Sequence, residues 1–149
     1  MKKIILSLSI SIIVILSFSS NVSAQTDKPY TEGTLWQIQF INTKPGMGQL
    51  YLKNVSEGWI KVMRAAKEGG LIMDFKVLQA PNASENDWNL ILMYELKNYA
   101  MLDGMSDKME ALTQKIFNAD EGVLHEKAVS RNDLRVQLGG RLTQELKFK

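Results

Sequence analysis

Cysteine is absent from this chain, and its 149 residues include one histidine, His125, and three prolines. Without cysteine the chain forms no disulfide, carries no lipid on a thiol and offers no thiolate to a metal. A single histidine excludes a site built from several imidazoles. Glycine-rich phosphate loops, G-x-S-x-G and H-E-x-x-H are also missing from the sequence. We therefore expect no metal and no cofactor, and we leave the catalytic residues unassigned.

Residues 1–24 have the three parts of a secretory signal peptide. Lys2 and Lys3 precede an apolar run over residues 4–18, and the segment ends in the small residues Val22-Ser23-Ala24. The run is shorter than the ~20 residues that span a bilayer, so we expect cleavage after Ala24 and no membrane association afterwards. The protein is predicted to be exported, to the periplasm or to the exterior.

Loss of the signal peptide changes the charge balance. Residues 1–24 contain two of the 18 basic residues and none of the 16 acidic ones, so the remainder is neutral, with 16 of each. It has no basic cluster, which argues against a nucleic-acid partner. A chain of this length buries about two-thirds of its unfolded surface, enough for one domain without disulfides.

Hydrophobic periodicity divides the rest of the chain into strands and helices. A polar segment over 25–33 is predicted to be a flexible lead-in. Strands are predicted over 34–42, 71–78, 88–96 and 141–149, and helices over 47–68, 98–117 and a more polar stretch, 121–138. In the first strand, Trp36, Ile38 and Phe40 are predicted to point inward. The order βαββα(α)β predicts one α+β domain over 34–149, a ferredoxin-like four-stranded antiparallel sheet with helices on one face and an insertion at 121–138.

The other face of this sheet is predicted to be covered by a second copy of the chain. Residues 90–94 are apolar at consecutive positions, so the third strand needs cover on both sides. Leu35 and Ile41 add apolar side chains to the second side of the first strand. A sheet-to-sheet homodimer is the simplest arrangement that buries both faces.

Several segments in this order resemble the dimeric α+β barrel superfamily. The resemblance covers about 34–117 and the last strand, and it is nearest to exported bacterial members without an assigned activity. The segments that carry it are Trp36-Gln37-Ile38-Gln39-Phe40, Lys44-Pro45-Gly46, Tyr51-Leu52, Trp59, Gly70-Leu71-Ile72 and Asp87-Trp88-Asn89-Leu90.

The resemblance implies a fold and a set of activities. Relatives include antibiotic-biosynthesis and haem-degrading monooxygenases, muconolactone isomerases and chlorite dismutases, with substrates bound between helices and sheet. The haem-degrading kind uses an asparagine at the end of the first strand, which matches Asn42, and a histidine on the second main helix. Residues 98–117 contain no histidine and His125 lies beyond them, so haem is not expected.

Aromatic residues supply the candidate binding site. Trp36 and Trp59 are predicted to line an apolar cavity between the first strand and the first helix, with Met105 and Met109 as its far wall; core packing is the alternative for both tryptophans. The polar candidates near this cavity are Asn42, Tyr51 and His125, and a surface position is the alternative for His125. Copper(I) held by the methionines is a further hypothesis, which core packing explains as well.

These observations favour an exported domain that binds a small apolar or aromatic molecule or serves a protective or structural role. The alternatives are a cofactor-independent monooxygenase or isomerase of the barrel type and a protein-interaction module. An enzyme requires a polar group inside the cavity, and a binding module requires an apolar cavity. An interaction module requires an exposed apolar patch and no cavity.

Overall fold

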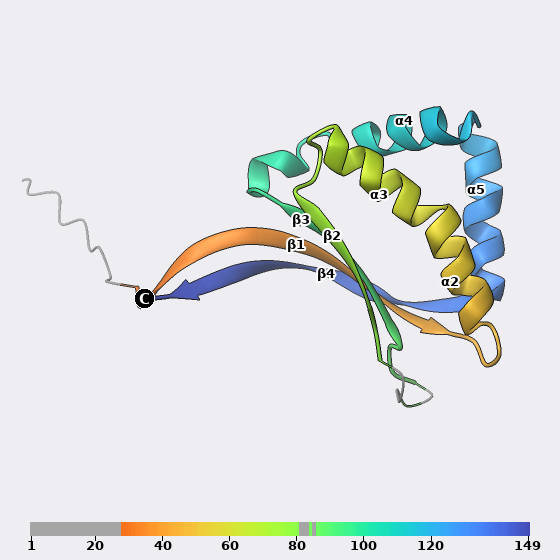
Figure 1. Cartoon of the computed structure of the whole chain (residues 1–149), viewed down its shortest axis with the longest axis horizontal. Helices are drawn as coiled ribbons and strands as arrows, with labels where there is room; N and C mark the ends of the chain where they lie inside the picture. The colour runs from red at the N-terminus through yellow and green to blue at the C-terminus, as the bar shows by residue number, and fades with distance from the viewer. Residues whose placement is uncertain (1–27, 81–83, 85) are drawn as a thin grey trace, which may run out of the picture.

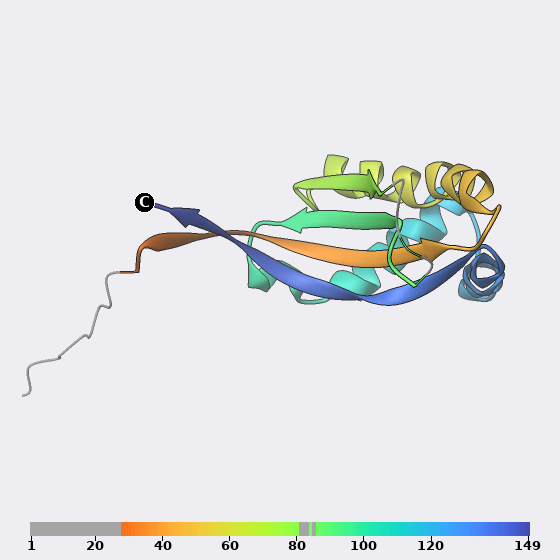
Figure 2. The same ribbon diagram turned by 90° about the horizontal axis from the view of Figure 1, so that it is seen from below.

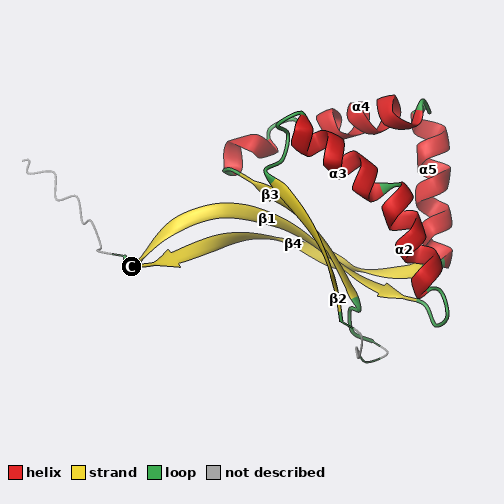
Figure 3. Cartoon of the chain, in the orientation of Figure 1, coloured by secondary structure: helices red, strands yellow, loops and turns green. Residues whose placement is uncertain are grey.

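A computed structural model describes residues 28–80, 84 and 86–149, and the predicted signal peptide lies outside them. The fold is α+β, as predicted, with one four-stranded antiparallel sheet. Its strands, in spatial order, are β2 (Asp74–Gln79), β3 (Leu90–Leu96), β1 (Tyr30–Thr43) and β4 (Arg135–Phe148). Figure 1 and Figure 3 show the helices gathered on one face of this sheet.

The helices follow the predicted apolar stripes but are broken at glycines. The first predicted helix is divided at Gly58 into α2 (Gly48–Glu57) and α3 (Trp59–Glu68). The second is divided at Gly104, which has φ +64°, into a short 3-10 turn, η1 (Tyr99–Leu102), and α4 (Met105–Phe117). None of the helices in the described part of the chain has the length and apolarity that a bilayer crossing requires.

The polar stretch after α4 is only partly helical. It forms α5 (Glu121–Ser130) and the turn η2 (Arg131–Asp133), and β4 starts at Arg135 where a helix was predicted as far as 138. Residues 135–137 pair with the end of β1, and this long-range pairing overrides the local helical pattern. Gly139 and Gly140, which directly follow the stretch predicted to be helical, lie inside β4, next to a register shift opposite Phe40 and Ile41.

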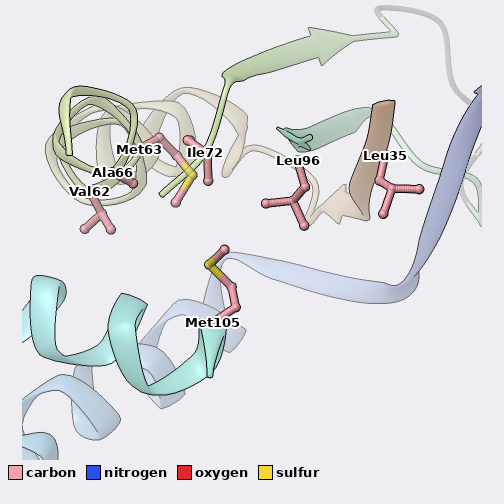
Figure 4. Close-up of a cluster of buried hydrophobic side chains, with 7 residues drawn as sticks. All are labelled: Leu35, Val62, Met63, Ala66, Ile72, Leu96 and Met105. Atoms are coloured by element: carbon pink, nitrogen blue, oxygen red, sulfur yellow. The ribbon is translucent and has the colours of Figure 1, made fainter. Parts of the chain in front are cut away.

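Two buried clusters fill the space between helices and sheet. The α3–α4 cluster, drawn in Figure 4, contains Leu35, Val62, Met63, Ala66, Ile72, Leu96 and Met105. The α2 cluster contains Ile41, Tyr51, Val55, Leu90 and Leu92. Both clusters take side chains from β1, which fixes the face of that strand that points toward the helices.

That face is the opposite of the predicted one. Leu35 and Ile41 are fully buried beneath the helices, aligned with Leu96 and Leu90 of β3. Because neighbouring residues of a strand point to opposite faces, Trp36, Ile38 and Phe40 lie on the side away from the helices. The prediction that these three point inward is wrong. Both faces of β1 carry apolar residues, and the register with the buried leucines of β3 decides which face is covered by the helices.

Strands β1 and β4 extend well beyond the other two. Each has 14 residues, and Figure 2 shows them continuing past β2 and β3 as a two-stranded ribbon. At its tip the rings of Tyr30 and Phe148 meet edge to face, with centres 6.0 Å apart, and the Lys149 N–H donates to the Pro29 carbonyl at 3.0 Å. Residues 30–33 are therefore strand, whereas a flexible lead-in was predicted there.

Candidate functional site

The predicted tryptophan cavity does not form, because Trp36 and Trp59 lie on opposite sides of the sheet. Trp59 packs against both buried clusters, and its indole meets the Phe75 ring edge to face at 5.8 Å. Trp36 lies on the far side, where the Lys76 ammonium sits 4.7 Å from its ring centre. Trp59 thus serves as a core residue, as the alternative interpretation had it.

The other predicted site residues are scattered. Tyr51 is buried in the α2 cluster, and His125 is exposed on α5. Met105 belongs to the α3–α4 cluster, with Met101 and Met109 packed against it, so these methionines fill the core in the way the packing interpretation predicted. Trp59 packs against the cluster that contains Tyr51, whereas Trp36 lies on the other side of the sheet and His125 on the exposed surface of α5.

Asn42 lies beside a hydrogen-bond network that borders a small pocket. The neighbouring Thr43 backbone N–H donates to Asn89 Oδ1 at 2.9 Å, and Asn89 Nδ2 donates to Thr43 Oγ1 at 2.8 Å and to Asn42 Oδ1 at 3.4 Å. A pocket of about 120 Å³ opens beside this network, lined by Thr43, Gly48, Leu52, Gln79, Ala80, Asn89 and Leu90. Sites for organic ligands usually measure about 300–1,000 Å³, so this pocket suits a few water molecules instead.

A polar seam interrupts the core between the two clusters. Gln37 and Gln39 lie on the same face of β1 as Leu35 and Ile41, and they occupy the two positions between these buried residues. Both glutamines are half-buried. Their backbone neighbours on β4 are Leu142 and Gly140, and Gly140 contributes no side chain that would cover Gln39.

Tyr94 completes the polar seam from β3. It pairs with Gln37 across the sheet and packs against the α3–α4 cluster. Burial raises the pKa of its phenol, which therefore stays protonated as a hydrogen-bond donor. The side chains of Gln37, Gln39 and Tyr94 have no hydrogen-bond partner within the described residues. Two half-buried amides and a phenol are thus available to a guest molecule.

Comparison with known proteins gives no relative. No family model matches the chain, and no curated protein or solved structure does so either. The function must be inferred from the geometry.

The sequence prediction missed the polar seam because it assigned Gln37 and Gln39 to the face away from the helices. The signal was present in the sequence as two glutamines that alternate between Leu35 and Ile41. Because alternate residues of a strand share a face, burial of Leu35 and Ile41 places Gln37 and Gln39 on the helix-facing side as well.

Proposed function

We propose that this chain is an exported, homodimeric binding module that holds a small apolar or aromatic molecule with a polar group between its helices and its sheet. The observation that carries the proposal is the polar seam. The two glutamine amides are half-buried between the buried Leu35 and Ile41, and their polar atoms are not among the fully buried ones without a partner. An amide can offer both donors and acceptors to a guest.

The chemistry of the polar seam favours binding over catalysis. A tyrosine with a raised pKa donates a hydrogen bond but is a poor base near neutral pH. The glutamines do not titrate, and the single histidine of the chain, His125, is exposed on α5. The monooxygenase or isomerase alternative therefore requires a substrate that supplies its own reactivity.

The homodimer is proposed from the sheet face away from the helices, which we call the far face. Its centre is apolar and includes the half-buried or exposed side chains of Trp36, Ile38, Phe40, Leu78, Trp88, Ile91 and Met93. Its margin is polar, with Lys76, Glu95, Arg141 and Thr143. An apolar centre with a polar rim is the usual composition of a protein interface.

The finer fold assignment belongs to the same proposal. The spatial order β2-β3-β1-β4, with helices between β1 and β2 and between β3 and β4, supports a ferredoxin-like arrangement. Together with the far face, this order supports membership of the dimeric α+β barrel superfamily, in which two such sheets pack against each other.

Ligand retention tests the binding proposal. Native mass spectrometry of the purified protein is expected to show a retained small molecule, and a combined Gln37→Leu and Gln39→Leu variant is expected to lose it. The same variant should be more thermally stable, because two leucines would replace half-buried amides with apolar side chains between the two clusters. Gln49→Leu, the same change at an exposed position of α2, is the control. Retention of the same molecule by the double variant would contradict the proposal.

Oligomeric state tests the homodimer. Ile91 pairs with Phe40 and Leu78 at the apolar centre of the far face, so Ile91→Lys places a charge where a partner sheet would exclude water. Light scattering at micromolar concentration is expected to give a dimer for the wild type and a monomer for the variant. Ser56→Lys, exposed on α2, should remain dimeric. A monomeric wild type would leave the far face to another protein, as the interaction-module alternative holds.

A further inference from the structure

Two arginines, one in η2 and one at the start of β4, lie near a buried tyrosine of α2. The Arg135 guanidinium lies 5.4 Å from the centre of the Tyr51 ring, which is 1% exposed. Arg131 is half-buried beside this pair, and its pKa is lowered by burial first and by the neighbouring Arg135 charge second. The Lys44 N–H donates to the Leu134 carbonyl at 2.9 Å, which holds the segment carrying both arginines against the end of β1.

The charges of these two arginines are not balanced by the chain. Arg135 Nε is buried and has no hydrogen-bond partner, although the guanidinium as a whole interacts with the Tyr51 hydroxyl and lowers its pKa. Over residues 28–80, 84 and 86–149, no carboxylate forms an ion pair with either guanidinium. Asp133 lies between the two arginines in sequence, yet its side chain is exposed and takes part in none of these ion pairs.

Such an arrangement is unfavourable without a counter-ion. Arginine keeps its charge at any physiological pH, so neither guanidinium relieves the repulsion by losing a proton. Partly desolvated like charges destabilise a fold, and a buried donor without an acceptor adds to the cost. An oxyanion with two oxygens would supply the missing acceptors, because the guanidinium fork matches carboxylate and phosphate groups.

We propose that Arg131 and Arg135 form a binding site for a small oxyanion at the junction of η2 and β4. The oxyanion is the carboxylate or phosphate group of a small molecule. The site is separate from the polar seam. The Tyr51 ring lies beside the Arg135 guanidinium, and both arginines act on the pKa of the Tyr51 hydroxyl, lowering it against the larger rise that burial causes. Arg135 is held in this position by pairing of its backbone with Thr43. Arg135 Nε is the donor in this site that lacks an acceptor.

The arginine side chains themselves provide the readout. In a nitrogen-15 spectrum at constant ionic strength, the Nε–H signal of Arg135, assigned through its loss in Arg135→Met, is expected to shift saturably with inorganic phosphate or with benzoate. Chloride should not shift it. Preference for benzoate would indicate an organic carboxylate as the natural ligand, and preference for phosphate a phosphorylated one. Absence of a saturable shift with either anion would overturn the proposal.

Variants separate a binding role from a packing role. Arg131→Met and Arg135→Lys are each expected to weaken anion binding by about 10- to 100-fold, the usual effect of losing one charge-assisted hydrogen bond. Arg131→Met should keep or raise the melting temperature in anion-free buffer, because it removes the repulsion, and should abolish the rise in melting temperature that phosphate causes. The control is Arg141→Met, since the exposed Arg141 contacts its neighbour Gly140 O at 2.8 Å. If Arg131→Met instead lowered stability equally with and without anion, the arginines would be structural.

Discussion

Substitution of the neighbours Leu35 and Trp36 tests which face of β1 belongs to the core. Leu35 is fully buried in the α3–α4 cluster, so Leu35→Ala leaves a cavity and should cost about 2–5 kcal/mol. Trp36 lies half-buried on the far face, with Lys76 beside its ring. In a monomer, Trp36→Ala removes contacts with solvent-exposed neighbours, and we expect a cost below about 1.5 kcal/mol, within the range of ordinary surface and strand effects.

The comparison must be made in a monomeric background, because Trp36 would also stabilise the proposed dimer. We therefore place both substitutions in the Ile91→Lys variant and measure thermal unfolding by circular dichroism. At about 4 °C per kcal/mol for a domain of this size, Leu35→Ala should lower the melting temperature by about 8–20 °C and Trp36→Ala by less than about 6 °C. A larger loss for Trp36→Ala than for Leu35→Ala would refute the assignment of faces and restore the prediction that Trp36 points inward.

Further predictions address single features of the chain. Asp120→Ala should destabilise α5 by about 1 kcal/mol, seen as faster hydrogen exchange in that helix, because Asp120 Oδ1 accepts the Val123 N–H at 2.9 Å. Gly140→Ala should lower the melting temperature, at a cost of about 1–3 kcal/mol, since a Cβ there would lie 2.6 Å from the Ile38 carbonyl oxygen, whereas Gly48→Ala should be nearly neutral. Lys67 donates to Asp74 at 2.7 Å, and this hydrogen bond, helped by that from the Phe75 backbone, lowers the pKa of Asp74 below its ordinary 3.8. Its contribution to stability is therefore complete above that value and is lost as the pH falls through the lower folded pKa, so Asp74→Asn should flatten the acid limb of a stability–pH curve. Intact-mass measurement of protein from the cell envelope should give a chain that starts at Gln25, and a chain that retains residues 1–24 would contradict export by this route.

Local patterns located most of the secondary structure. The apolar stripe that includes Val55, Val62 and Met63 predicts a helix with period 3.6, and these residues are buried in α2 and α3. Alternation over Phe75 and Val77 predicts β2. Both signals arise within a few residues of the chain, where the periods of helix and strand are set by backbone geometry alone.

The choice between two apolar faces could not be made locally. Trp36 and Phe40 are larger than Leu35 and Ile41, which suggested that the aromatic side faced the helices. In the structure, the buried leucines of β3 align with Leu35 and Ile41 and draw that side inward. Which face of β1 is buried depends on residues more than 40 positions away, so no short stretch of the sequence predicts it.

The site formed by Arg131 and Arg135 was not predicted from the sequence, for a related reason. Arg131 and Arg135 are four residues apart, a spacing that places two charges on the wet side of a surface helix. The helix instead ends at Ser130, and the following turn and strand bring both guanidiniums to Tyr51. The alternation Arg135, Val136, Gln137, Leu138 was the available signal for an early start of β4.

The hydrogen bond between Lys149 and Pro29 makes the ribbon tip a single point of attachment. A tether at either end would leave the domain at the same place, on the side away from α5 (Figure 1). A surface, a second domain or a fluorescent reporter joined there would lie away from α5 and from the helix-covered part of the sheet (Figure 1). Force that pulls the two strands apart at the tip would separate β1 from β4 one residue pair at a time before it reached the core.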